Sequence, residues 1–332
     1  MSEPRHNVLG IGNAIVDVIS RTTDEFLSRH EIPKGGMHLI DEAQAEALYG
    51  DTGPSIEISG GSAANTIVGV ASFGGTGAYV GKVKNDTLGK VFSHDIRASG
   101  VTFETAMAEE GPSTARSLIL VTPDGERTMN TYLGACVHLG PAELDADLIA
   151  SAQVTYLEGY LWDPEAAKQA FREAARIARE AGRKVSLTLS DPFCVERHRD
   201  GFMELVKGNV DILFANEAEI MSLYQVNDFD EAAVCVKQDC ELAALTRSEK
   251  GCVVVSGDHT AHVPAVPVAK VVDTTGAGDM FAAGFLYGYT QARDLETCGK
   301  LGVLAASEII SHVGARPETP FADLARQHGL AS

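Results

Sequence analysis

Short apolar runs alternate with helical patterns over much of this chain. After residue 150 the apolar runs lie at 154–157, 184–189, 210–214, 242–246 and 252–256. The segments between most of them place apolar residues three or four positions apart, as one face of a helix does. Strand patterns that alternate with helix patterns are typical of a parallel sheet covered by helices. The order of the pattern therefore predicts an α/β fold.

The first strongly apolar run, residues 8–19, is interpreted as one strand. Gly10 and Gly12 resemble the start of a dinucleotide-binding loop, but the third glycine is missing and the run continues like a strand, which argues against such a site. Asn13 and Asp17 lie four positions apart and therefore on one face of that strand. Buried polar side chains need partners, so either the protein or a hydroxylated ligand must supply them.

A hairpin is predicted in the middle of the chain. Residues 114–122 and 127–133 have the pattern of strands and flank a Pro-Asp-Gly turn, which is a strong hairpin signal. Residues 20–40 also look like short strands and loops that project from a core. Arg116 and Arg127 fall on the hairpin, where they either reach an anionic ligand or remain solvated charges, the usual role of charges on edge strands.

Glycine turns lead into helices at two places, and the first is Gly60-Gly61-Ser62. An apolar helix over residues 66–73 follows this turn. Asn65 falls in the first turn of the helix, where its amide either faces a cleft or caps the helix.

The second glycine turn, residues 273–279, is the segment around which we expect the site to be organised. Residues 271–272 look like the end of a strand, and Gly276 to Gly278 stand where an apolar helix begins. A helix start presents unpaired N–H groups and a partial positive charge, and glycines let an anion approach the main chain. Asp279 beside such a pocket either accepts the proton of an attacking hydroxyl or merely complements the helix dipole.

Asn216 and Glu219 follow the strand at 210–214 and stand three apart at a predicted helix start. Ligands of parallel α/β sheets bind beyond the carboxyl ends of the strands. The oxygen atoms of these two side chains can hold Mg²⁺ directly or through water. The same spacing satisfies a helix cap with its capping-box glutamate, and spacing alone favours the cap.

Composition restricts the class of protein. The chain has 332 residues, 45% of them hydrophobic, enough for one large domain. The net charge of −19 argues against nucleic acid or an anionic membrane as partner, because no basic footprint is present. Six cysteines lie scattered without paired metal spacings and are expected to be reduced core residues of a cytoplasmic protein. We expect neither a secretory signal nor a membrane helix.

Taken together, these motifs resemble the ribokinase-like (PfkB) carbohydrate kinase family, and within it the adenosine kinases. The residues that carry the resemblance are Gly60, Gly61, Ser62 and Asn65 with Gly74 and Gly75, then Asn216 and Glu219, then residues 273–279. Their order and separation make the match specific over nearly the whole chain. A Gly-x4-Gly-Lys-Ser/Thr loop does not occur in the sequence, which disfavours a P-loop kinase.

The resemblance implies a fold and a division of roles. It implies one ribokinase-like domain over residues 1–332, a three-layer α/β/α fold with a mostly parallel central sheet, and a small lid of strands from about 14–40 and 104–133. Asp279 is then the base that deprotonates a primary hydroxyl. Gly276, Ala277 and Gly278 form the anion hole for the γ-phosphoryl group of ATP.

The family motifs also assign binding residues. Substrate binding is expected at Asn13, Asp17, Gly60, Gly61, Ser62 and Asn65. ATP binding is expected at Asn216, Thr246, Gly251, Asp273 and Thr275. By the same resemblance Asn216 and Glu219 organise Mg²⁺ around the phosphates. Some relatives use a potassium ion near the anion hole, and the region of Asp273 and Thr275 can support one.

The predicted reaction is ATP-dependent 5′-phosphorylation of adenosine to AMP. Asn13 ahead of Asp17, and the segments at 191–193 and 213–217, resemble nucleoside kinases more than ribokinases. The alternative acceptors are inosine or guanosine, ribose, and fructose or another ketose, and the alternative to an enzyme is a nucleotide or sugar sensor. The only partners expected are these small molecules, in a monomer or homodimer.

Overall fold

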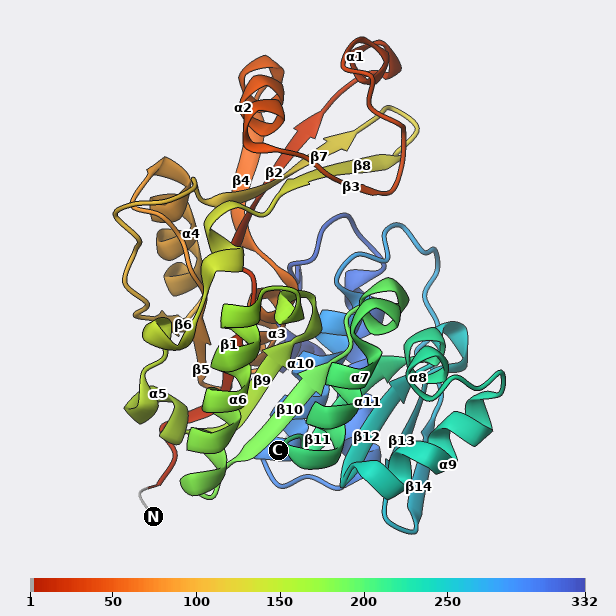
Figure 1. The fold of residues 1–332 in the computed structure, drawn as a ribbon. Coiled ribbons are helices and arrows are strands. Elements are labelled where there is room, and N and C mark those ends of the chain that lie inside the picture. Colours follow the sequence, from red (N-terminus) through yellow and green to blue (C-terminus); the bar gives the residue numbers. More distant parts are fainter. Residues whose placement is uncertain (1–2, 332) are drawn as a thin grey trace.

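The computed structural model describes residues 3–331, and two β-sheets organise this part of the chain (Figure 1). The larger sheet has nine strands in the order β14-β13-β12-β11-β10-β9-β1-β5-β6. They are β1 (His6–Ile11), β5 (Gly77–Val80), β6 (Val101–Phe103), β9 (Ala152–Glu158), β10 (Lys184–Thr188), β11 (Ile212–Asn216), β12 (Leu242–Thr246), β13 (Cys252–Ser256) and β14 (His259–Val263). Neighbours from β6 to β12 pair in parallel, and β13 and β14 add an antiparallel edge.

Helices cover both faces of this sheet. One face carries α5 (Ala146–Ala150), α6 (Glu165–Glu180), α7 (Pro192–Gly208), α8 (Glu217–Tyr224) and α9 (Phe229–Asp239). The other carries α3 (Ser62–Ser72), α4 (Thr87–Ala98), α10 (Ala277–Thr290) and α11 (Leu295–Ile309), and α12 (Phe321–Gln327) packs beside α3 and α11. The 3₁₀ turns are η1 (Gly134–His138), η2 (Pro141–Glu143), η3 (Gly159–Trp162) and η4 (Ser248–Lys250). The expected three-layer α/β/α fold is therefore confirmed.

The period-two pattern of the strands explains why both faces are covered. In β11, Leu213 packs into the core beneath α6 to α9, whereas Ile212 and Phe214 pack into the core beneath α3, α10 and α11. A strand that is apolar on both faces must be buried on both, as is typical of parallel sheets. Five of the six cysteines are buried, as expected, and no disulfide joins any of the six within residues 3–331.

A second sheet of five strands, in the order β3-β8-β7-β2-β4, stands above the larger sheet as a lid (Figure 1). Its strands are β2 (Ile15–Arg21), β3 (Met37–Leu39), β4 (Ser55–Gly60), β7 (Ala115–Val121) and β8 (Arg127–Tyr132), and its helices are α1 (Asp24–Arg29) and α2 (Glu42–Asp51). The antiparallel pairing of β7 with β8 confirms the predicted hairpin. The lid also contains β4 and α1, which the sequence patterns did not reveal.

The prediction of one strand over residues 8–19 is wrong. The chain leaves the larger sheet at the end of β1 and enters the lid sheet at Ile15. At Gly12 a Cβ atom would lie 2.3 Å from a carboxylate oxygen of Glu158 and 2.8 Å from the Cβ of Ala63, so only glycine fits. The run therefore divides beside a glycine whose nearest neighbours are distant in the sequence, which a local pattern cannot reveal.

Two further glycines mark where the chain passes between lid and body. Gly61 joins β4 to α3 with φ of 98°, and a Cβ there would lie 2.1 Å from the carbonyl oxygen of Asn13. Gly134 follows β8 with φ of 45°, and a Cβ there would lie 2.2 Å from the carbonyl oxygen of Ser113. The backbones of the connecting segments are therefore in direct contact.

One other prediction fails near the C-terminus. Residues 271–272 lie in an extended loop between β14 and α10 and form no strand, and both valines are exposed. Within residues 3–331, no helix is both long and apolar enough to cross a membrane.

Candidate active site

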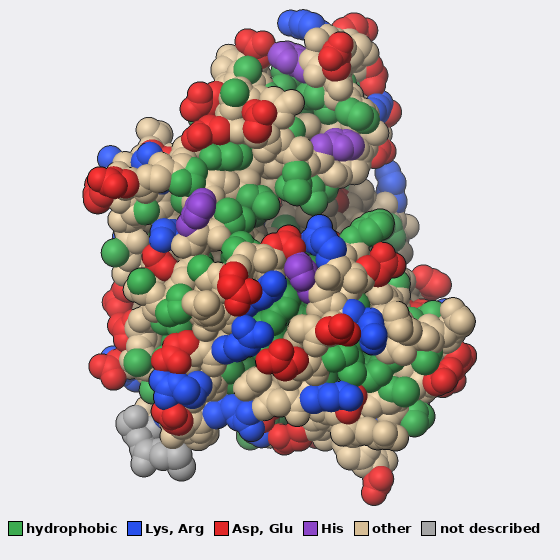
Figure 2. Space-filling model, viewed as in Figure 1, with side chains coloured by type: hydrophobic (Ala, Val, Ile, Leu, Met, Phe, Trp, Pro, Cys, Tyr) green, Lys and Arg blue, Asp and Glu red, His purple; other side chains and the backbone are tan. Residues whose placement is uncertain are grey.

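A cavity of about 710 Å³ lies between the lid and the carboxyl ends of the parallel strands, and Figure 2 shows the hollow between the lid and the body. Among the predicted site residues, it is lined by Asn13, Asp17, Gly61, Ser62, Asn65, Asn216, Glu219, Thr246, Thr275, Gly276, Gly278 and Asp279. Four of the predicted residues lie outside its lining: Gly60, Ala277, Gly251 and Asp273. The fold therefore brings together most of a site that the sequence spreads over 267 positions, from 13 to 279.

Polar residues at the ends of neighbouring strands form the floor of this cavity. Asn13 follows β1, Glu158 ends β9, Thr188 ends β10, Asn216 ends β11 and Thr246 ends β12. Because parallel strands end at the same edge of a sheet, their last residues gather in one place. This explains why these five polar residues lie together at the cavity floor.

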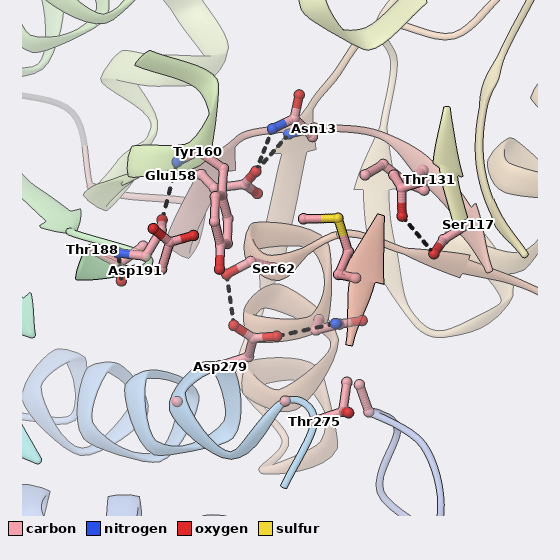
Figure 3. A pocket seen from close by; sticks show the side chains of 18 of the residues that line it. Asn13, Ser62, Ser117, Thr131, Glu158, Tyr160, Thr188, Asp191, Thr275 and Asp279 are labelled. Atoms are coloured by element: carbon pink, nitrogen blue, oxygen red, sulfur yellow. Dashed lines mark hydrogen bonds between the residues drawn. The ribbon is translucent and has the colours of Figure 1, made fainter. Parts of the chain in front are cut away.

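Asp279 stands in the first turn of α10, with its carboxylate directed toward the start of α3 (Figure 3). Ser62 Oγ donates a hydrogen bond to Oδ1 at 2.6 Å, and Asn65 Nδ2 donates one to Oδ2 at 3.1 Å. The two glycine turns of the sequence therefore lie next to each other, and these hydrogen bonds join them. Ser62 and Asn65, predicted to bind substrate, hold the carboxylate in place in this structure.

The main chain at the start of α10 supplies unpaired donors. Gly276 is the N-cap residue with φ of 80°, and α10 has no side-chain cap. In the part of the chain described, the N–H groups of Gly276, Gly278 and Asp279 have no hydrogen-bond acceptor, whereas the Ala277 N–H donates to the carbonyl of Thr274 at 3.2 Å. Such a helix start is a receptor for phosphate oxygens. Of the three residues predicted to form the anion hole, Gly276 and Gly278 therefore have N–H groups that can bind an anion, whereas the N–H group of Ala277 is already bonded.

The environment of Asp279 favours its action as a base. Burial raises the pKa of Asp279 above its ordinary value, because the charged form loses hydration. The hydrogen bonds from Ser62 and Asn65 and the positive charge of Arg316 oppose this shift. A carboxylate with a raised pKa binds a proton more strongly, which suits a group that must take one from an alcohol.

The sequence motifs did not include Glu158, yet this residue lies at the floor of the cavity and binds several groups there (Figure 3). Its Oε1 accepts hydrogen bonds from the Asn13 backbone N–H at 3.2 Å and from Asn13 Nδ2 at 2.7 Å, and its Oε2 accepts one from the Ala63 N–H at 2.8 Å. The side chain therefore ties the end of β1 to the start of α3. The signal in the sequence that could have identified Glu158 is its position, as a charged residue directly after the apolar run 154–157.

The stability of the unliganded protein is expected to depend on the pH through Glu158. Burial raises the pKa of this carboxyl from 4.5 to about 7. The folded state thus binds this proton more tightly than the unfolded chain, so the stabilisation is complete below pH 4.5 and is lost as the pH rises through about 7. The Glu158→Gln variant lacks this group, and its free energy of unfolding should fall less steeply over that interval.

Urea unfolding at a series of pH values measures this slope. The matched control is Glu46→Gln, on an exposed position of α2, which should keep the wild-type slope. Equal slopes for wild type and Glu158→Gln would contradict the assignment.

Asp17 lies on β2 of the lid and lines the cavity from above. Burial raises its pKa to about 6, and the charges of Arg316 and Arg127 partly oppose this. Gly60 is adjacent, and a Cβ there would lie 2.4 Å from the Asp17 carboxylate. Gly60 thus serves the site by making room for Asp17, not by lining the cavity.

Asn216 and Glu219 form the capping box that their spacing allowed. The Asn216 N–H donates to Glu219 Oε2 at 2.9 Å, its Nδ2 donates to Oε1, and its Oδ1 accepts from the Glu219 N–H at 2.8 Å. Burial raises the pKa of Glu219 to about 7. Each carboxylate oxygen retains a further lone pair and the group lines the cavity, so the pair fits a hydrated Mg²⁺ held through water.

Asp273 has three hydrogen-bond partners, and one of them is a cation. Its Oδ1 accepts from the Thr275 N–H at 3.0 Å, and its Oδ2 accepts from the Gly314 N–H at 2.9 Å and from the guanidinium of Arg127. Because the Arg127 guanidinium already neutralises Asp273, the region of Asp273 and Thr275 does not fit a potassium ion in this structure. Arg127 and Arg116 are largely buried, so the expectation that both are solvated edge charges is wrong.

Thr246 and Gly251, which were both expected to bind ATP, differ in their position relative to the cavity. Thr246 ends β12 and lines the cavity. Gly251 lies outside it with φ of 84°, in the turn before β13, where a Cβ would lie 2.1 Å from the Val263 carbonyl oxygen. Gly251 therefore shapes the turn, and its role toward ATP stays a prediction.

Apolar side chains form the rim and the roof of the cavity. Met37 and Leu39 of β3 line it from the lid, and Tyr160 and Phe193 line it from the body. Phe193 is 76% exposed and Tyr160 is 41% exposed, which is unusual for large aromatic side chains. Exposed apolar surface inside a cavity is typical of a binding site.

Comparison with known proteins supports this description. Residues 56–322 match the pfkB family carbohydrate kinases. The fold matches the crystal structure of adenosine kinase from Sinorhizobium meliloti with a TM-score of 0.89 and 56% identity over 98% of this chain and 99% of that one. A probable sugar kinase from Rhizobium etli CFN 42 matches with a TM-score of 0.90 and 55% identity over 98% and 99%. An uncharacterized sugar kinase of Archaeoglobus fulgidus is 32% identical, covering 76% of this chain and 98% of its own length.

Proposed function

The chain belongs to the pfkB family of carbohydrate kinases and is therefore a phosphotransferase with an alcohol acceptor, and we propose that this acceptor is the 5′-hydroxyl of adenosine. The kinase family implies ATP as the phosphoryl donor. One observation carries the proposal: the Asp279 carboxylate and the unpaired amides of α10 meet in a cavity whose other wall is apolar and aromatic. The base and the anion site act in phosphoryl transfer, and the apolar wall binds the nucleobase.

In the proposed mechanism Asp279 accepts the proton of the attacking hydroxyl. Ser62 and Asn65 hold one carboxylate oxygen each, so that the group is oriented before substrate arrives. The N–H groups of Gly276 and Gly278 stabilise charge on the transferring phosphoryl group. Phosphoryl transfer depends mainly on such positioning and charge stabilisation.

Mg²⁺ would be held through water beside Glu219, whose geometry is fixed by Asn216. When bound, the ion neutralises charge on the phosphates of ATP. The raised pKa of Glu219 reflects a buried carboxyl that lacks a counter-charge, which a divalent cation supplies.

The lid closes the site over the substrate. Met37, Ile119 and Met129 present side chains to the cavity from lid strands. Apolar cover of this kind excludes water, which otherwise competes with the alcohol for the phosphoryl group.

Adenosine fits the wall of the cavity better than a free sugar does. Tyr160, Phe193, Met37 and Leu39 offer flat or apolar surface, which suits a purine ring. A hexose carries hydroxyls around its ring and would leave them unpaired against this surface. Polar groups that include Asn13 on the floor and Asp17 on the lid suit the ribose hydroxyls.

A sugar acceptor is the second candidate. The probable sugar kinase from Rhizobium etli resembles this chain as closely as the Sinorhizobium adenosine kinase does. Glu158, Asn13 and Asp17 also place several polar atoms at the floor and the lid.

Release of ADP across a panel of acceptors at fixed ATP and Mg²⁺ decides the acceptor. The panel comprises adenosine, inosine, guanosine, ribose and fructose. We expect the highest kcat/KM with adenosine and AMP as the product by mass spectrometry. A far higher kcat/KM with ribose or fructose would refute the proposal.

The Phe193→Ala variant tests the role of the aromatic wall. Stacking of a base on an aromatic side chain contributes about 1–3 kcal/mol, so KM for adenosine should rise about tenfold or more. Val234→Ala, at an exposed apolar position on α9 outside the cavity lining, should leave KM unchanged. An unchanged KM in Phe193→Ala would show that the base binds elsewhere.

A further inference from the structure

The lid reaches the loop before α10 through one ion pair, between Arg127 of β8 and Asp273. The two side chains are only 10% and 8% exposed. The same Arg127 nitrogen lies 3.4 Å from Thr275 Oγ1. A lid side chain thus contacts the segment that leads directly into the anion site at Gly276.

A buried carboxylate needs a counter-charge. Asp273 receives two backbone N–H groups, from Thr275 and Gly314, but these bring no full positive charge. Loss of the cationic partner leaves a buried charge uncompensated, which strongly disfavours that arrangement. Either the guanidinium of Arg127 or a small cation from solution must therefore accompany Asp273.

We propose that Arg127 is a positioning residue that serves as the built-in cation of the loop at 273–276, so that catalysis requires no free monovalent cation. The guanidinium neutralises Asp273, and Asp273 in turn fixes the Thr275 N–H one residue before Gly276. Because Arg127 belongs to the lid and Asp273 to the body, the anion site is complete only while the lid covers it. Lid position and phosphoryl stabilisation are thereby coupled.

The proposal rests on the phosphotransferase activity proposed above, but not on the identity of the acceptor. The test compares KCl with choline chloride, from 0 to about 100 mM at constant ionic strength. For wild type, we expect kcat to differ less than about twofold between the two salts. For Arg127→Gln, we expect kcat in choline to fall at least about tenfold and to recover most of this loss in KCl, because K⁺ can then reach Asp273.

Thermal unfolding supplies a readout independent of turnover. KCl should raise the midpoint of Arg127→Gln above that in choline, because a cation that binds only the folded state stabilises it. Wild type and the double variant Arg127→Gln/Asp273→Asn should show no such rise. Arg127→Lys keeps the charge and should need no potassium.

The matched control is Arg21→Gln, at an exposed arginine on the lid strand β2, which should behave as wild type in both salts. The proposal is overturned if wild type loses most of its activity in choline. It is also overturned if KCl neither restores nor stabilises Arg127→Gln, since the arginine would then act on something other than Asp273. A wrong assignment of the acceptor would leave the unfolding results unaffected.

Discussion

The Asp279→Asn variant is expected to lower kcat by about 10² to 10⁴-fold while adenosine and ATP still bind. Asparagine has nearly the same shape and can keep contacts with Ser62 and Asn65, but it cannot take a proton. The loss should therefore appear in kcat more than in KM. Steady-state kinetics measure the first effect, and calorimetric titration of both ligands measures the second.

A control separates catalysis from support of the helix. A carboxylate in the first turn of a helix contributes about 0.3–1 kcal/mol by complementing its dipole. Asp230 occupies the first turn of α9 and is exposed, so Asp230→Asn should cost a similar amount of stability and no activity. If Asp279→Asn retained wild-type turnover, the residue would be only a helix partner and the protein could not use it as a base.

Two neighbouring glycines should respond oppositely to alanine. At Gly276 a Cβ would lie 2.7 Å from the Cβ of Ala315, and φ of 80° is unfavourable for alanine, so Gly276→Ala should destabilise the fold by about 1–2 kcal/mol or more. At Gly278, among the described residues, a Cβ meets no atom within 4 Å beyond its chain neighbours and the backbone of its own helix. Alanine stabilises a helix by up to about 1 kcal/mol relative to glycine. Gly278 lines the cavity, however, so an added methyl group obstructs the approach of a phosphate.

We therefore expect Gly278→Ala to gain stability while kcat falls about 10² to 10³-fold, comparable to the loss of one donor of an oxyanion hole. Thermal unfolding and ADP release measure the two quantities. Gly50→Ala, within α2 and with no atom within 4 Å of the added Cβ, is the matched control: it should gain similar stability and keep its activity. Full activity in Gly278→Ala would place the phosphoryl group away from these amides.

Local signals predicted the elements that local interactions determine. The hairpin of β7 and β8 followed from two strand patterns and the turn between them. The cap of α8 followed from the spacing of Asn216 and Glu219, which the structure confirms as a capping box. The start of α10 followed from glycines ahead of an apolar helical pattern.

Contacts between distant residues explain the failures. Residues 8–19 look like one strand because nothing within them shows that Glu158 and Ala63 approach Gly12. Arg127 looks like a solvated charge because its partner, Asp273, lies 146 positions away. The valines at 271–272 have a strand composition, but no neighbouring strand pairs with them among the described residues.

Most of the predicted site residues line one cavity, although they are far apart in the sequence, because they belong to family motifs. What the motifs could not reveal was which residues touch one another. Ser62 and Asn65 were expected to hold substrate, and the structure shows them holding Asp279. Glu158 binds Asn13, and the charge of Arg316 partly opposes the rise that burial causes in the pKa of Asp17, and neither residue belongs to the motifs described above.

The connecting segments between the two sheets determine how the lid can swing. At Gly61 and Gly134 the connecting segments contact each other through backbone atoms, with no side chain between them. Such close backbone contacts allow little movement within the connecting segments. We therefore expect the lid to rotate as a rigid body about a fixed hinge axis and not to bend along its length. Rotation about that axis would move Asp17 and Arg127 together. One movement of the lid would then both bring Asp17 over the alcohol and place Arg127 beside Asp273 at the anion site.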